Sequence, residues 1–135
     1  MKLKTTNLLI VLSFGFIAII SIAAIEPAPN KPEYENLQVL PKDISSKQLQ
    51  HIMVDEFQDG LGVGCGFCHA KKEGSLLLDY SSDEKPEKEI ARAMMRMTLE
   101  INKKYFEMEQ PSIGDEQLVV TCSSCHRGTP HPEKL

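Results

Sequence analysis

Tryptophan is absent from the 135 residues, and the aromatic content is only 6%. A chain of this length is enough for one domain and too short for two ordinary ones. In so small a domain, buried apolar side chains leave little net stability. The scarcity of large flat side chains therefore favours a core that is completed by cofactors.

A surplus of basic charge is also missing. The 19 acidic residues outnumber the 15 basic ones, which gives a formal net charge of −4. Nucleic-acid-binding proteins normally carry a basic face, so this balance argues against that class. The acidity predicts a basic docking surface on a protein partner, and the alternative is that it simply confers solubility.

Cysteine occurs only four times, in two pairs that are each followed directly by histidine. The segments are Cys65-Gly66-Phe67-Cys68-His69 and Cys122-Ser123-Ser124-Cys125-His126. No cysteine remains for a separate disulfide framework. A four-cysteine zinc site would have to bridge 53 residues between the pairs, which is far outside the usual spacing. Neither a disulfide nor zinc explains the two histidines.

The repeated pattern is the attachment signature of c-type haem. Two thiols at this spacing can each form a thioether with a vinyl group of the same porphyrin, and the adjacent histidine then ligates the iron. We therefore predict two covalently attached c-type haems. The thioethers are assigned to Cys65, Cys68, Cys122 and Cys125, and the iron ligands to His69 and His126.

Residues 1–25 have the pattern of an export element. Lys2 and Lys4 precede an uncharged run that is mostly apolar from Leu8 onward. The run predicts either a signal peptide, cleaved near Ala23, or a retained membrane anchor. The positive N-terminus places the rest of the chain on the periplasmic side of a bacterial cytoplasmic membrane.

A proline-rich linker is predicted over residues 26–36, so that the folded domain spans 37–135. A helix is expected to begin with Ser45 as its cap and Gln48 three residues later. Its apolar stripe consists of Leu49, Ile52, Met53 and Phe57. Three glycines, Gly60, Gly62 and Gly64, end it, and their turn is expected to pass close to a flat cofactor.

A second, longer helix is predicted to begin between Ser82 and Pro86 and to close near Pro111 and Gly114. Its side chains predict one buried apolar stripe, with Arg92 on another face. The stripe consists of Ile90, Met94, Met97, Ile101, Tyr105 and Met108. Residues 70–82 are expected to form a loop and those after 127 an irregular tail.

Each iron needs a ligand opposite its histidine, and methionine and histidine are the candidates. For the first iron, Met53 lies on the apolar stripe, whereas His51 is about 200 degrees away around a helix. For the second, Met94 and Met97 share a face and Met95 points about 100 degrees from Met94. The spacing alone does not choose among these methionines.

From about Asn36 to Pro130, the chain resembles the c-type cytochrome subunit of photosynthetic reaction centres and its smaller relatives. The most specific matches are Arg-x-Met-x-x-Met-Thr-x-x-Ile-Asn at residues 92–102 and Thr-Cys-x-x-Cys-His-Arg-Gly at residues 121–128. Weaker ones are Leu-Gly-Val-Gly-Cys before the first motif and residues 79–86.

The resemblance implies a mainly α-helical multihaem cytochrome c fold with little or no sheet. Two repeats, each of a helix, a turn and a Cys-x-x-Cys-His segment, would surround the two haems. It also implies Met53 as the second ligand of the iron on His69. For the iron on His126 it implies Met97, with Met94 as the alternative.

Together these features predict an exported dihaem cytochrome, not an enzyme, that carries single electrons between a membrane donor and an acceptor outside the cytoplasm. Its partner would be a membrane respiratory complex or another cytochrome, and a homodimer would bring four haems together. The alternative is a haem peroxidase or a gas or redox sensor in which one iron keeps an open coordination site. His51 and His131 read as surface residues, so no obvious distal acid or base supports that alternative.

Overall fold

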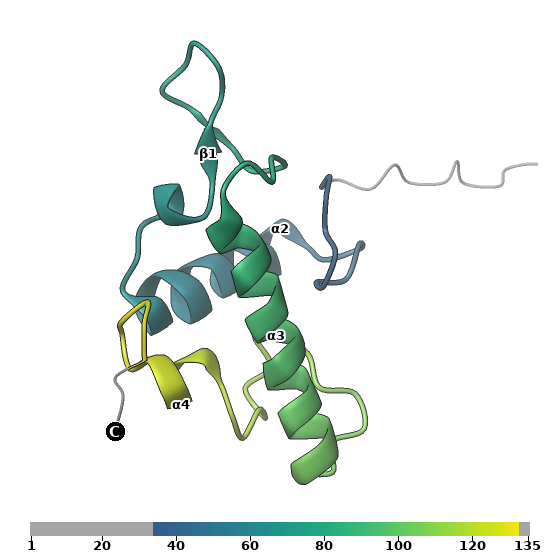
Figure 1. The fold of residues 1–135 in the computed structure, drawn as a ribbon. Coiled ribbons are helices and arrows are strands. Elements are labelled where there is room, and N and C mark those ends of the chain that lie inside the picture. Colours follow the sequence, from purple (N-terminus) through teal and green to yellow (C-terminus); the bar gives the residue numbers. More distant parts are fainter. Residues whose placement is uncertain (1–33, 133–135) are drawn as a thin grey trace, which may run out of the picture. The chain divides into compact units, whose positions relative to one another are not determined.

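Helices carry most of the regular structure in the computed structural model, which describes residues 34–132 (Figure 1). The predicted export element and most of the predicted linker lie outside the described residues. The elements are α2 (Ser46–His51), the π-helical segment η1 (Ile52–Asp59), the 3-10 turn η2 (Cys65–Phe67), β1 (Ala70–Lys71), β2 (Leu78–Asp79), α3 (Pro86–Tyr105) and α4 (Cys122–His126). The prediction of a mainly α-helical fold with little sheet is confirmed.

The first helix begins as predicted, because Ser45 caps α2. The Gln48 amide donates to the Ser45 hydroxyl at 3.3 Å, and the Ser45 amide donates to the Gln48 side chain. Segment η1 then continues the helical path in the wider π form, which is rare and is often found near functional sites. The path ends at Leu61, because Gly62 adopts a left-handed φ of 64°.

The core is small and draws on segments far apart in the chain. Its buried members are Leu40, Ile44, Ile52, Met95 and Ile113. The predicted stripe of the first helix packs here, with Ile52 fully buried and Leu49, Met53 and Phe57 partly buried. The burial predicted for that stripe is therefore confirmed.

The predicted loop at residues 70–82 contains a small antiparallel hairpin. Strands β1 and β2 pair Ala70 with Asp79 and Lys71 with Leu78. The hairpin follows His69 directly, so it extends the first motif (Figure 1). Two residues per strand are too few to give a recognisable alternation of apolar and polar side chains.

Helix α3 begins where the sequence predicts, with Pro86 in its first turn, but its end and its buried face differ from the prediction. It ends at Tyr105, and Glu107 beyond it has a left-handed φ of 56°. The buried residues of α3 are Arg92, Met95, Thr98 and Asn102. Several members of the predicted stripe are instead exposed: Ile90, Met94, Met97 and Tyr105.

Arg92 is the clearest correction, because its charged side chain is buried rather than on an outer face. Its guanidinium donates to Asp83 and to Glu89 at 2.9 Å each, and to the backbone oxygen of Asn36 at 3.3 Å. A buried charge is tolerable only when it is paired and hydrogen-bonded in this way. These contacts hold the segment around Asn36 and the segment before α3 against the helix.

The Arg92 contacts predict an acid-sensitive fold. Hydrogen bonds from Arg92 and Asn36, with a further contribution from Lys88, hold the pKa of Asp83 well below its usual range. The stabilisation is therefore complete above about pH 5 and is lost as the pH falls toward and through the lowered folded pKa. We expect Asp83→Asn to lower Tm at pH 7 and to flatten the decline of Tm between about pH 5 and pH 2.

Thermal unfolding followed by circular dichroism across that range measures both effects. The matched control is Glu84→Gln, which removes an exposed carboxylate from the same segment and should preserve the wild-type pH dependence. If Tm fell with pH in parallel for Asp83→Asn and the wild-type protein, the Asp83 carboxylate would not be the source of the acid sensitivity.

Candidate haem-binding site

The first Cys-x-x-Cys-His segment lies on η2 and runs directly into β1. The His69 amide donates to the Cys65 oxygen at 3.0 Å, which closes the turn. Lys85, just before α3, donates its Nζ to the Gly66 oxygen. The segment is thus tied both to the hairpin and to the start of α3, with Cys65 exposed and Cys68 half-buried.

His69 is held in an environment that favours the neutral imidazole. Its ring meets the ring of Tyr80 edge-on, with centroids 5.0 Å apart. Burial lowers the pKa of His69, and the positive charges of Lys88 and Arg92 lower it further. Its Nδ1 is buried and has no hydrogen-bond partner among the described residues. A neutral ring with a nitrogen that the polypeptide leaves unsatisfied suits an external partner such as a metal ion.

The second segment forms the short helix α4. Thr121 and Ser124 make a capping box at its start, in which the Thr121 amide donates to Ser124 Oγ at 3.0 Å. His126 Nδ1 lies 3.0 Å from the backbone oxygen of Thr129. A carbonyl can only accept, so Nδ1 is the donor of this bond, and Nε2 is the nitrogen that a metal ion would bind. Metal-ligating histidines are commonly oriented in this way.

The end of the first helical path, just before the first motif, meets the residues after the second motif at a junction of glycines. The Gly128 amide donates to the Gly60 oxygen at 3.0 Å. A Cβ at Gly62 would overlap the Gly128 oxygen, whereas a Cβ at Gly64 would meet nothing within 4 Å. The glycine-rich turn therefore makes a close approach to the backbone after the second motif, and its expected approach to a flat cofactor stays a prediction.

A largely apolar cleft lies beside this junction. The exposed methionine stripe of α3 lines it, together with residues from the first helix and from both motifs. These include Phe57, Leu61, Cys68, Ile90, Met94, Met97, Ile101, Cys122, Cys125, His126 and His131. The cleft encloses only about 130 Å³, so it can seat one face of a flat ring rather than surround it. It also gives a reason for the exposed apolar residues of α3.

Burial raises the pKa of two thiols of the cleft, those of Cys68 and Cys122. Burial and the Glu56 carboxylate, which accepts a hydrogen bond from the thiol, raise the pKa of Cys122 to about 12. Burial and Glu87 also raise the pKa of Cys68, while Lys85 opposes them. All four cysteines are free, and within residues 34–132 no three His, Cys, Asp or Glu side chains form a metal cluster. Each pair of free thiols is followed by a histidine that could bind a metal ion, and an apolar cleft lies beside the pairs. These features fit covalently attached haem better than a disulfide or a zinc site.

The predicted methionine ligands differ in their positions. Met97 lines the cleft with His126, and so does Met94. Around the axis of α3, Met94 lies between Met97, about 60 degrees away, and Met95, about 100 degrees away. Met53 is half-buried and packs against the core, and it is not among the residues that line the cleft.

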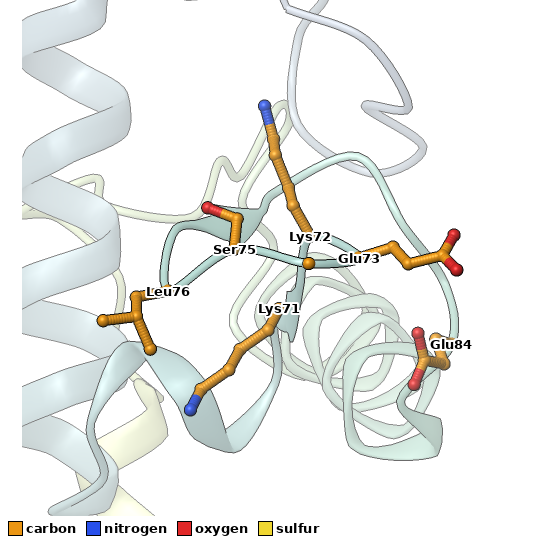
Figure 2. A pocket seen from close by; sticks show the side chains of 7 residues that line it. Lys71, Lys72, Glu73, Ser75, Leu76 and Glu84 are labelled. Atoms are coloured by element: carbon orange, nitrogen blue, oxygen red, sulfur yellow. The ribbon is translucent and has the colours of Figure 1, made fainter.

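A larger hollow of about 730 Å³ lies beside the hairpin, but its side chains do not converge. Figure 2 shows Lys71 and Lys72 pointing away from each other, while the carboxylates of Glu73 and Glu84 lie together at one side. Leu76, at its edge, is 87% exposed. A binding site needs polar groups aimed at a common point, and this open surface does not provide them.

Several supporting residues have no signal in the sequence. Lys85, Glu56 and Thr129 act on the two motifs through contacts that neither a motif nor a helical period reveals. Asn102 and Arg92 belong to the specific pattern at residues 92–102, but the pattern does not state their roles.

Comparison with known proteins identifies the family of the chain. A family model described as the photosynthetic reaction centre cytochrome C subunit matches residues 18–135. Cytochrome c-554 of Chloroflexus aurantiacus is 32% identical over 100 residues, which cover 74% of this chain and 22% of that protein.

Two reaction-centre proteins give similar matches. The photosynthetic reaction center cytochrome c subunit of Rubrivivax gelatinosus is 29% identical over 98 residues, covering 66% of this chain and 23% of the relative. The photosynthetic reaction center cytochrome c subunit of Roseobacter denitrificans is 32% identical over 106 residues, covering 78% of this chain and 27% of the relative. This chain thus spans about a quarter of the length of these relatives, and no solved structure matches it. It belongs to the photosynthetic reaction centre cytochrome c subunit family of electron-transport proteins.

Proposed function

We propose that the protein is a dihaem c-type cytochrome that carries single electrons. The observation that supports this most strongly is the pair of Cys-x-x-Cys-His segments, which both contribute thiols to one apolar cleft. Haem iron supplies a one-electron couple when it is bound. The chain itself has to hold two such groups covalently and keep water from their faces.

In this proposal the cysteines of the two motifs attach the haems and the histidines bind the irons. Cys65 and Cys68 would hold one haem, and Cys122 and Cys125 the other. Thr129 orients His126 through Nδ1, and the surroundings of His69 favour its neutral, ligating form. The apolar stripe of α3 excludes water from the cleft.

We assign methionine as the second ligand of both irons. For the first iron, Met53 is implied by the resemblance alone, because it packs against the core. For the second iron, the resemblance implies Met97, with Met94 as the alternative, and both line the cleft together with His126. Methionine ligation tends to raise the reduction potential relative to two histidines.

Substitutions along α3 separate the two candidates. Alanine at the true ligand, Met97 or Met94, should convert one of two haems to high spin and lower its potential, because the thioether is lost. Alanine at the other position should leave the spectrum unchanged. Absorption spectra and redox titrations of the purified variants provide the measurement.

Met95→Ala is the matched control. Met95 touches the cleft, but it is 6% exposed and packs in the core. Its truncation should therefore cost about 2–5 kcal/mol of stability while the haem spectra are retained. Normal spectra in both Met94→Ala and Met97→Ala would contradict ligation from α3.

The function itself is tested on the full-length protein by haem content and redox titration. We expect two covalent haems per chain, two one-electron transitions and no carbon monoxide binding to the reduced form at neutral pH. One haem per chain would contradict the dihaem assignment. A high-spin resting spectrum with carbon monoxide binding would instead favour the peroxidase or sensor alternative.

We place this activity on the periplasmic side of a bacterial cytoplasmic membrane. The names of two relatives assign them to photosynthetic reaction centres, but this chain spans about a quarter of their length. We therefore propose a membrane respiratory complex or another cytochrome as its partner, with a homodimer as one route to a row of four haems. Within residues 34–132, no helix is both long and apolar enough to cross a membrane.

A further inference from the structure

Asn102 has no exposed surface, and every hydrogen-bonding position of its side chain is used. Its Nδ2 donates to the Thr98 oxygen at 2.9 Å and to the Val120 oxygen at 2.7 Å. Its Oδ1 accepts from the amides of Val119 at 2.9 Å and Val120 at 3.1 Å. A carboxamide has two N–H donors and two acceptor lone pairs, so this set is complete.

These bonds join two parts of the candidate site. Residues 118–121 belong to no helix or strand, so Asn102 supplies partners that regular structure would otherwise provide. Thr121 then caps α4, and Cys122 is its first residue. On the other side, Asn102 lies on the same helix as Met94 and Met97, one to two turns further along. The side chain thus connects the methionine helix to the residues immediately before the second motif.

We propose that Asn102 is a positioning residue: it fixes the second Cys-x-x-Cys-His segment relative to the methionines of α3 and so maintains methionine ligation of the second iron. This inference rests on the proposed dihaem function. The first motif is held by other contacts, from Lys85 and the hairpin. Loss of the Asn102 side chain should therefore act on one haem and spare the other.

The side chain is specific in its chemistry. Aspartate would place a carboxylate against the carbonyl oxygens of Thr98 and Val120, both of which now accept from the amide. Alanine would leave the amides of Val119 and Val120 without this acceptor. A side chain that served only to fill space in the core would need none of these four hydrogen bonds. The complete set therefore favours a role in orienting the backbone.

The first test compares Asn102→Ala and Asn102→Asp with Leu99→Ala in the full-length, haem-loaded protein. Leu99 packs against the core from the same helix, so its truncation controls for a general loss of packing. We expect both Asn102 variants to lose the low-spin methionine signature of one haem and to lower its potential, while the other haem stays unchanged. Leu99→Ala should lower Tm and retain both signatures.

Equal effects on both haems, or unchanged spectra with a lower Tm as in Leu99→Ala, would reduce Asn102 to a core residue and overturn the proposal. Should the Asn102 variants fail to fold, hydrogen exchange in the wild-type protein still decides. The amides of Val119 and Val120 should then exchange as slowly as interior amides of α3, and rapid exchange overturns the proposal. Haem per chain is counted in the same samples, because a wild-type value below two would refute the proposed function itself.

Discussion

Replacing Cys122 and Cys125 with serine is expected to lower the covalently bound haem from two per chain to one. Serine cannot form the thioether, so His126 alone would have to retain the second group. The first segment lies on separate elements, η2 and β1, and should keep its haem. Intact-protein mass and the haem absorbance per chain measure the loss.

The reciprocal variant, with serine at Cys65 and Cys68, should remove the other haem and leave the second spectrum in place. Ser123→Ala provides the control, because Ser123 lies between the paired cysteines on the exposed side of α4 and should leave haem content unchanged. Two haems per chain after loss of either pair would contradict the attachment sites.

Alanine at Gly62 is expected to destabilise the protein by about 2–5 kcal/mol, from left-handed strain and from overpacking together. Gly62 has a φ of 64°, which disfavours any side chain. A Cβ there would also overlap the backbone oxygen of Gly128, and a backbone atom cannot move aside as the end of a flexible side chain can. Relief of the overlap would pull apart the junction that includes the Gly128 to Gly60 hydrogen bond.

Gly64→Ala is the matched control two residues away. Gly64 has an ordinary extended conformation, with φ of −81° and ψ of 163°, and open space around its Cβ position. We expect a change of less than about 1 kcal/mol there, which is the scale of glycine effects on the unfolded chain. Urea unfolding monitored by circular dichroism compares the two. Equal stabilities for Gly62→Ala and Gly64→Ala would rule out the close backbone approach.

The sequence predicted those features of the fold that depend on residues close together in the chain, namely helix boundaries and the two motifs. The cap at Ser45 and the start of α3 at Pro86 follow from side chains within one turn of each boundary. The end of the first helix follows from the glycines after it. The cysteine and histidine candidates depend on spacing alone. The structure places the first motif on a 3-10 turn and the second on the short helix α4, and both expose or half-expose their thiols.

The buried face of α3 could not be predicted in the same way. Helical periodicity assumes that apolar residues face the core, but here Arg92 and Asn102 are buried because partners distant in sequence satisfy their polar groups. Met94 and Met97 face the cleft instead. The pattern detected an apolar stripe correctly and assigned it to the wrong surroundings.

The position of Met53 shows a related limit. Its stripe is buried as predicted, yet the same burial places Met53 against the core rather than in the cleft. A period cannot distinguish a methionine that packs in a core from one that ligates iron, since both require an apolar face. The assignment of Met53 therefore stays a prediction.

The hydrogen bond between Gly128 and Gly60 also sets a condition on the order of folding. A ribosome makes the chain from its N-terminus, so Gly60 and the whole first motif exist well before Gly128 is added. The junction closes a long segment of chain, and contacts of such sequence separation form slowly. The surroundings of the first motif are consequently completed by residues that are synthesised well after it, and a nascent chain has to carry its first two cysteines through that interval without this support.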